Sequence, residues 1–235
     1  ISLVDKANIM TPGASRINNF STEMLGSFYV NDLYTTSGNL FGMGGRTAST
    51  TTGILIDGNR YEALKRFVYD RQPDGDAGLD TRFDVWFQSS SEYSNYDFTK
   101  FLEPAKRQGL GNAYYPEIPI MRLSEIYYIA CEAQIGKDNA LALQYLNDVR
   151  NNRNLSLIQT VPDDATLLEY LVREMRKDFI GDGRTFLMHK RLFYDIYTVR
   201  GETIPASDNI FVIPIPDDEY EFSGIEKPGN TTDNN

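Results

Sequence analysis

In residues 118–200, apolar side chains recur at intervals of three and four, a spacing that predicts helices. The first expected helix covers residues 123–133 and ends before Gly136, a residue type that commonly follows a helix. Asp138 fits the cap of a second helix, whose apolar positions continue to Val149. Because only a short polar link joins them, the two helices are expected to pair as an antiparallel hairpin.

Two further helices are expected after this hairpin. The sequence Thr166-Leu-Leu-Glu169 fits a capping box, which predicts a helix that starts at Thr166 and ends near Phe179. A fourth helix is expected over about residues 185–199. Residues 201–235 are expected to be extended, because prolines disfavour helix in the residues before them, and to end in a disordered tail.

The pattern in residues 1–117 is different. Ser, Thr and Gly dominate residues 35–52, so this part is expected to consist largely of loops. Helical spacing is found over residues 59–69. Residues 81–88 alternate between apolar and other side chains, which predicts a strand with Trp86 on the face opposite Phe83.

The predicted fold is therefore mainly α, with a tetratricopeptide-like helical hairpin and further helices packed with a loop-rich region that contains short strands. A single hairpin cannot bury both of its faces, so it must pack on other parts of the chain. We expect one domain: residues 1–117 form a loop-rich segment with possible ligand loops, residues 118–200 form a helical segment, and residues 201–235 form an extended segment and tail.

Composition and charge exclude several classes of protein. The chain has 235 residues, a net charge of −10 and 41% hydrophobic residues, which is too apolar for a disordered chain. The acidic balance argues against a nucleic-acid partner, because phosphate binding needs a concentrated cationic surface. One Cys and one His exclude an internal disulfide and metal sites that need several of these ligands. No apolar run is long enough to cross a bilayer.

Several separated motifs resemble one family. Residues 121–133 and 142–151 resemble the helical pair of the SusD/RagB family. Residues 178–184 resemble its EFxxEGxR element, with Asp182 where the family has Glu, and residues 213–219 resemble its PIPxxE element. The sequence Asp80-Thr-Arg82 resembles part of its YxxxDxR element. Order and spacing agree over residues 60–229, so the chain is expected to be the C-terminal portion of such a protein.

The resemblance implies a surface-exposed outer-membrane lipoprotein of Bacteroidetes whose lipid anchor lies outside this chain. Such a protein binds glycans without catalysing a reaction and delivers them to a SusC-like TonB-dependent transporter. No cofactor, metal or nucleic acid is implied. The alternative is a helical-hairpin scaffold that contacts proteins and binds no sugar.

Oligosaccharide binding needs apolar surface for the CH faces of the sugar and hydrogen-bond partners for its hydroxyl groups. Aromatic and cationic residues in polar or Gly-rich surroundings meet this need, and the tentative ligand-binding residues are Trp86, Tyr93, Tyr96, Tyr34, Phe41 and Arg46. For Trp86 the alternative is a second buried face, and for Tyr93 and Tyr96 it is a role as loop anchors. No catalytic residue is predicted.

Other residues that carry reactive groups are given structural roles. His189 is expected to be a packing or surface residue, because general-base catalysis needs an oriented partner. Cys131 is expected in the core. The acids of residues 74–80 fit a solvated turn better than a calcium loop. The cluster of basic residues between Arg173 and Arg191 is expected to pair with acids, with binding of an anionic glycan as the alternative.

Overall fold

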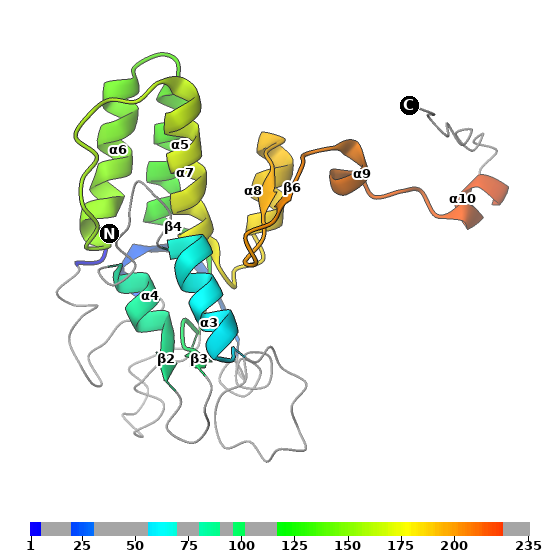
Figure 1. Ribbon diagram of the computed structural model, residues 1–235, viewed down its shortest axis with the longest axis horizontal. Coiled ribbons are helices and arrows are strands. Elements are labelled where there is room, and N and C mark those ends of the chain that lie inside the picture. Colours follow the sequence, from blue (N-terminus) through cyan, green and yellow to red (C-terminus); the bar gives the residue numbers. More distant parts are fainter. Residues whose placement is uncertain (6–19, 31–55, 70–79, 90–95, 102–116, 223–235) are drawn as a thin grey trace.

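In the computed structural model, residues 1–5, 20–30, 56–69, 80–89, 96–101 and 117–222 are described. Three long helices dominate and lie side by side in Figure 1: α5 (Leu123–Gln134), α6 (Asn139–Asn152) and α7 (Asp164–Phe179). The predicted hairpin of α5 and α6 is confirmed, and the side chain of Asp138 accepts a hydrogen bond from the N–H of Leu141. The mainly α architecture with a few short strands is also confirmed.

The shorter elements surround one end of these helices. They are η1 (Ser21–Glu23), β1 (Met24–Tyr29), α3 (Gly58–Leu64), the π-helix η2 (Lys65–Tyr69), α4 (Thr81–Trp86), β2 (Phe87–Ser89), β3 (Tyr96–Phe98) and β4 (Glu117–Arg122). After α7 come α8 (Thr185–Leu192), β5 (Ile196–Tyr197), β6 (Thr203–Ile204), α9 (Asp208–Phe211) and α10 (Asp217–Phe222). The segment with α9 and α10 extends away from the rest of the molecule (Figure 1).

Three antiparallel pairs of strands join segments of the chain. The pair β1–β4 brings Met24 opposite Arg122, and β2–β3 brings Phe87 opposite Phe98. The third pair, β5–β6, forms a short hairpin. Strand β4 includes Pro119 and leads directly into α5, whose start at Leu123 agrees with the helix predicted over residues 123–133. A proline is tolerated here because, in the part of the chain that is described, the β1–β4 ribbon has two strands and an irregular register.

The strand predicted over residues 81–88 is wrong for its first six residues, which form α4. Asp80 caps this helix, because its carboxylate accepts a hydrogen bond from the N–H of Arg82 at 3.0 Å. All residues of α4 except Asp84 are buried. A helix that is buried on nearly every side lacks the polar face that reveals a helical period, so an alternating pattern could arise by chance.

Three other predicted helix boundaries or faces also differ. The third helix starts at Asp164 and not at Thr166, because Asp163 caps it by accepting the N–H of Thr166 at 2.9 Å. Helix α8 ends at Leu192, where the next residue turns into the left-handed region with φ 47°. In α5, Ala133 is exposed although it was expected to face the neighbouring helix.

The buried apolar residues form two clusters. The aromatic core consists of Val4, Phe20, Ile56, Leu64, Val68, Tyr69, Phe83, Val85, Trp86, Phe87, Phe98 and Phe101. The helical core consists of Tyr128, Cys131, Ala142, Leu143, Leu146, Val149, Leu167, Leu171, Val172, Met175, Phe179 and Met188. The aromatic core draws on the short elements, and the helical core draws on α5 to α8.

Candidate functional site

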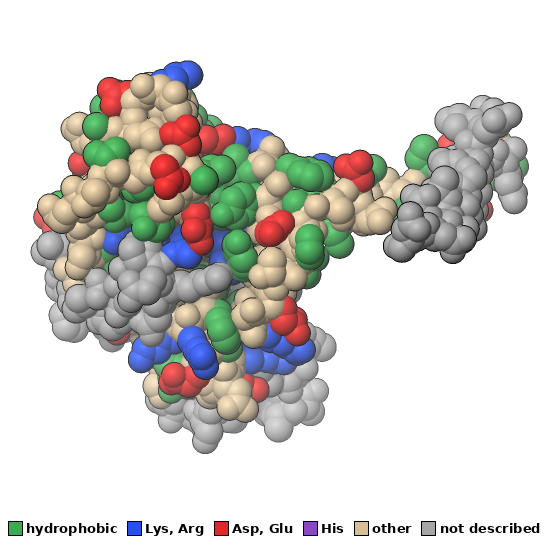
Figure 2. All heavy atoms as spheres, turned by 45° about the horizontal axis from the view of Figure 1, so that its top comes forward, with side chains coloured by type: hydrophobic (Ala, Val, Ile, Leu, Met, Phe, Trp, Pro, Cys, Tyr) green, Lys and Arg blue, Asp and Glu red, His purple; other side chains and the backbone are tan. Residues whose placement is uncertain are grey.

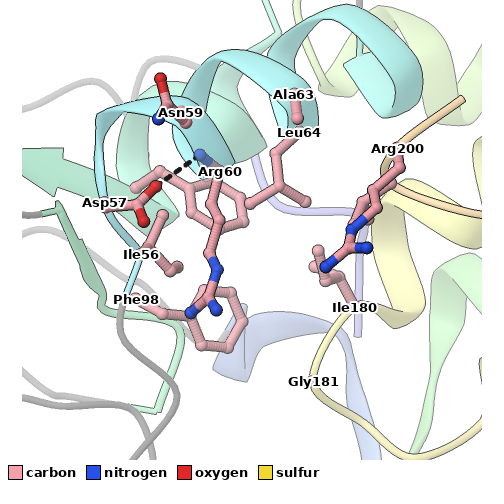
Figure 3. A pocket seen from close by; sticks show the side chains of 12 residues that line it. Ile56, Asp57, Asn59, Arg60, Ala63, Leu64, Phe98, Ile180, Gly181 and Arg200 are labelled. Carbon is pink, nitrogen blue, oxygen red and sulfur yellow. Dashed lines mark hydrogen bonds between the residues drawn. The ribbon is translucent and has the colours of Figure 1, made fainter.

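A cavity of about 740 Å³ opens between α3, the β2–β3 ribbon and the chain after α7. Its volume lies within the range typical of small-molecule sites. The lining residues are Ile56, Asp57, Asn59, Arg60, Ala63, Leu64, Phe87, Phe98, Ile180, Gly181, Val199 and Arg200, and Figure 3 shows how they surround the space. We refer to it as the α3 cavity.

The floor of the α3 cavity belongs to the aromatic core. Ile56, Leu64, Phe87 and Phe98 are buried, and the rings of Phe87 and Phe98 have centroids 5.2 Å apart. Ile56 is held in place by β3, because its carbonyl accepts the N–H of Tyr96 at 2.8 Å. The floor is therefore an apolar surface formed by packed core side chains.

A glycine forms part of the wall next to Phe98. Gly181 has φ +78°, and a Cβ atom there would lie 2.7 Å from Cε1 of Phe98. Any other residue would both strain the backbone and displace the ring. Gly181 is the first glycine of the 178–184 motif, so this part of the motif shapes the cavity.

A second glycine brings Arg200 to the opposite wall. Gly201 directly follows Arg200 in the turn between β5 and β6, and its φ is +84°. A Cβ atom at Gly201 would lie 2.5 Å from Cε1 of Phe67, so the turn packs closely on the π-helix that continues α3. This contact places Arg200 across the cavity from Arg60 (Figure 3).

The structure does not support Trp86 as a sugar-stacking residue. Its side chain is 0% exposed, lies in the aromatic core against the ring of Phe20, and carries the ammonium group of Lys100 above its ring at 4.5 Å. The prediction failed because residues 81–86 form a helix and not a strand, so that Trp86 faces the interior like Phe83 and Val85.

Tyr96 is the other predicted site residue that the structure describes. It is half-buried, and its ring stacks on that of Tyr61 with centroids 3.6 Å apart and planes within 9°. Burial, with the neighbouring Tyr96, raises the pKa of Tyr61. This pair lies beside the α3 cavity but does not line it. The remaining predicted residues, Tyr34, Phe41, Arg46 and Tyr93, lie outside the described residues.

Six charged residues of the recognised motifs belong to a buried ion network. Its members are Glu23, Asp80, Arg82, Lys100, Arg122, Arg150, Arg153, Glu174, Lys177, Asp178 and Asp182. The Arg82 guanidinium lies 2.7 Å from both Asp80 and Glu174. Sequence reasoning missed this network, and the expectation that Asp80 lies in a solvated turn was wrong. Three charged residues spaced along α7, at 174, 177 and 178, are the signal that could have indicated a charged inner face.

The network lies between the two cores. Lys100 lies over Trp86, and the Arg153 guanidinium lies 4.4 Å from the ring centroid of Phe20, both in the aromatic core. On the other side, the hydroxyl of Tyr128 in the helical core donates to Asp178 at 2.9 Å. These charges therefore join the cores, and none of them lines the α3 cavity.

Burial and neighbouring charges shift the pKa values in the network. Burial lowers the pKa of Lys100 to about 7, although Asp182 favours its charged form. Burial would raise the pKa of Asp178, but Arg153, Arg82 and the other cations hold that pKa well below its usual range. The pKa of Glu174 is lowered in the same way, chiefly by Lys177. These carboxylates are stabilised as anions by paired cations.

The remaining candidates have structural surroundings. His189 is buried, its Nδ1 lies 3.3 Å from the Tyr194 carbonyl, and burial lowers its pKa. Cys131 is buried in the helical core, which raises its pKa to about 12. In the basic cluster, the acid-pairing prediction is confirmed by four ion pairs: Arg173–Glu169, Lys177–Glu174, Arg184–Glu125 and Arg191–Glu132. Among the described residues, no group of acids, Cys and His could hold a metal ion.

The chain resembles known proteins of one family. A family model described as the SusD family matches residues 54–193. A SusD superfamily protein from Bacteroides thetaiotaomicron VPI-5482 aligns with a TM-score of 0.56 and 20% identity over 87% of this chain and 48% of its own. A SusD-like carbohydrate binding protein from Bacteroides vulgatus ATCC 8482 aligns with a TM-score of 0.57 and 18% identity over 97% and 55%. This chain thus spans about half the length of these solved structures. No curated protein sequence matched.

Proposed function

The chain belongs to the SusD family, and on this premise we propose that it binds an oligosaccharide at the outer surface of a bacterial cell. In this proposal the bound glycan passes to a SusC-like TonB-dependent transporter in the outer membrane. The protein is held there as a lipoprotein and catalyses no reaction.

The observation that carries the proposal is the position of the α3 cavity within the family match. Ten of its twelve lining residues, all except Val199 and Arg200, fall within residues 54–193. One solved relative with the same fold bears the name carbohydrate binding protein. A cavity of this kind, with an apolar floor and a few polar groups on its rim, suits a sugar, which has CH faces and hydroxyl groups.

The charges of the molecule support binding without catalysis. Glycoside hydrolysis ordinarily needs two carboxyl groups that flank one bond. Among the described residues that line the α3 cavity, Asp57 is the one acid, and its Oδ1 accepts the N–H of Arg60 at 2.8 Å. The carboxylates of the ion network are buried and paired with cations.

Aromatic residues near the cavity are proposed as additional ligand contacts. Tyr96 lies next to the cavity through its backbone bond to Ile56, and it remains a proposed contact. Tyr93, Tyr34, Phe41 and Arg46 are proposed contacts from parts of the chain outside the described residues.

The cavity can be tested with a matched pair of variants on α3. Ala63 lines the cavity and is half-buried, so Ala63→Phe places a ring inside it; Glu62 is exposed on the same helix, so Glu62→Phe places the same ring on the surface. With a panel of neutral and acidic oligosaccharides and calorimetry, the unchanged protein is expected to bind at least one glycan. Ala63→Phe should weaken that binding at least about tenfold and Glu62→Phe should not. If Ala63→Phe bound the glycan as tightly as Glu62→Phe and the unchanged protein, the cavity would not be the binding site. Absence of any glycan binding would contradict the proposed function.

Delivery to a transporter is tested separately. Among the described residues, no helix is long and apolar enough to cross a membrane. We expect the protein, expressed in its native cell, to co-purify with a large TonB-dependent β-barrel. Capture of that transporter by a protein that binds no glycan would instead support the alternative, a helical-hairpin scaffold.

A further inference from the structure

We propose that the α3 cavity is selective for an acidic sugar and binds the carboxylate of a uronic acid residue between Arg60 and Arg200. This inference rests on the proposed function, and it names the substrate class of the same site. It follows from the charge, the geometry and the apolar floor of the cavity.

The α3 cavity is locally positive in an acidic protein. The chain carries a net charge of −10, whereas the described residues that line the cavity include two arginines and one acid. The acid, Asp57, is turned toward the start of α3, where its Oδ1 accepts the N–H of Arg60. Figure 2 shows several Lys and Arg side chains, together with a few Asp and Glu side chains, on the lobe at the bottom of the view.

The two guanidinium groups come from separate elements and face the same space. Arg60 projects from α3, and Arg200 projects from the β5–β6 turn on the opposite side of the cavity (Figure 3). The turn is internally fixed, because the Thr198 hydroxyl accepts the N–H of Arg200 at 3.2 Å and the Thr198 carbonyl accepts the N–H of Gly201 at 3.1 Å. Close packing of Gly201 on Phe67 holds the turn beside α3. The backbone position of Arg200 is therefore set before a ligand arrives.

The charge of Arg200 is not neutralised as that of other arginines is. Arg82, Arg150 and Arg153 have buried carboxylate partners, and Arg173, Arg184 and Arg191 pair with acids nearer the surface. Within the described part of the chain, no ion pair includes the Arg200 side chain. A guanidinium group recognises a planar carboxylate through two parallel hydrogen bonds, so a carboxylate is the complement that this wall lacks.

The floor of the cavity narrows the class of ligand. Ile56, Leu64 and Phe98 present apolar surface to the same cavity as the two guanidinium groups. A simple inorganic anion would leave this surface uncovered, and a neutral sugar would supply no carboxylate to Arg200. A uronic acid has both a ring with CH faces and a carboxylate at its edge, and it therefore complements both parts.

The test uses titration calorimetry on the protein at low ionic strength, where charge pairing is least screened. The probes are trimers of galacturonate and of glucuronate, each paired with its methyl ester, which keeps the ring and removes the charge. At least one uronate trimer is expected to bind about tenfold or more tightly than its ester. Arg200→Gln and Arg60→Gln should each remove most of this preference, while Arg191→Gln, a surface ion-pair variant, should retain it.

Each contrary outcome has a distinct meaning. Equal binding of uronate and ester, or a preference that survives both Arg60→Gln and Arg200→Gln, overturns the carboxylate assignment. Tighter binding of a sulfated trimer than of either uronate overturns the choice of carboxylate. Binding of neutral glycans alone overturns the inference and leaves the proposed function intact, whereas binding of no glycan overturns both. Because Arg60 and Arg200 are exposed, a thermal melt is expected to show that the variants fold.

Discussion

Among the described residues, the aromatic core and the helical core each contain twelve buried apolar residues, yet they are built in opposite ways. The helical core comes from consecutive helices, so its members are close in sequence and are mostly aliphatic. The aromatic core gathers residues between Val4 and Phe101, and seven of its members are aromatic. Large rings can fill the space between short, irregular elements, because each one buries a large area from a single backbone position.

The buried ion network is what the two cores share. Arg82 follows the cap of α4 beside the aromatic core, and its partners Glu174 and Asp178 lie on α7, a helix that contributes to the helical core. A buried charge that loses its partner is much more costly than an apolar contact that is lost. Because the ion network contacts both cores, we expect it to couple their unfolding.

The strongest test of this coupling is Arg82→Met. The change leaves Asp80, Glu174 and Asp178 without their shared cation in a buried setting, so the free energy of unfolding is expected to fall by about 3–5 kcal/mol. Urea unfolding should be followed by the fluorescence of Trp86, the sole tryptophan, which reports on the aromatic core, and by helical circular dichroism. In the unchanged protein the two transitions should coincide.

A matched control is Arg191→Met, which removes a pair whose arginine side chain is 56% exposed. Its expected cost is below about 1 kcal/mol, because water screens exposed pairs. If Arg82→Met cost no more than this control, or if the two probes gave separate transitions in the unchanged protein, the network would not join the cores.

The same contrast explains how much of the fold could be predicted from the sequence. Residues 139–152 and 164–179 have one buried and one exposed face, so their spacing identifies them as helices. Residues 81–86 are buried on nearly all sides, so their spacing contains no such information. Strand β1 pairs with β4 across about ninety residues of chain, and no local pattern encodes that pairing.

The candidate site was harder to predict than the fold. Arg60 and Arg200 line the same cavity because Gly201 packs on Phe67 and Gly181 packs on Phe98, contacts that depend on the complete fold. The 178–184 motif was recognised, but its role was not: Asp178 and Asp182 belong to the ion network, and Gly181 shapes the cavity wall. Trp86 was predicted to bind the ligand because of its residue type, but its side chain is buried and cannot contact a sugar.

A smaller effect is expected from Leu146→Ala in the helical core. Leu146 is fully buried on α6, and its truncation should cost about 3 kcal/mol through lost contacts and an unfilled cavity. If the cores unfold together, the Trp86 transition should shift to lower urea by the same amount as the helical signal, although Leu146 is outside the aromatic core. A shift in the helical signal alone would show that the cores are separate cooperative units.

Acid should weaken the network progressively. The pKa values of Asp178 and Glu174 are lowered in the folded protein, so the stabilisation is present above the ordinary carboxyl pKa and is lost as the pH falls toward the lowered values. Between about pH 5 and pH 3 the free energy of unfolding is expected to fall by about 1–3 kcal/mol for these groups. Urea unfolding at several pH values measures this slope. Glu174→Gln should reduce it, and an unchanged slope in that variant would exclude Glu174 as a source.

The last test needs no substitution. It compares the exposure of one residue in each core, Cys131 in the helical core and Trp86 in the aromatic core. Burial raises the pKa of Cys131 to about 12, so little thiolate forms near neutral pH, and a disulfide reagent should label the folded protein roughly a thousandfold more slowly than the unfolded chain. Acrylamide should likewise quench Trp86 poorly in the folded state, because its side chain is fully buried.

If both groups become accessible together as urea rises, global unfolding exposes them, and the cores form one cooperative unit. Labelling of Cys131 at urea concentrations that leave Trp86 protected would instead show that α5 opens on its own, which would limit the coupling to the elements that the ion network directly contacts.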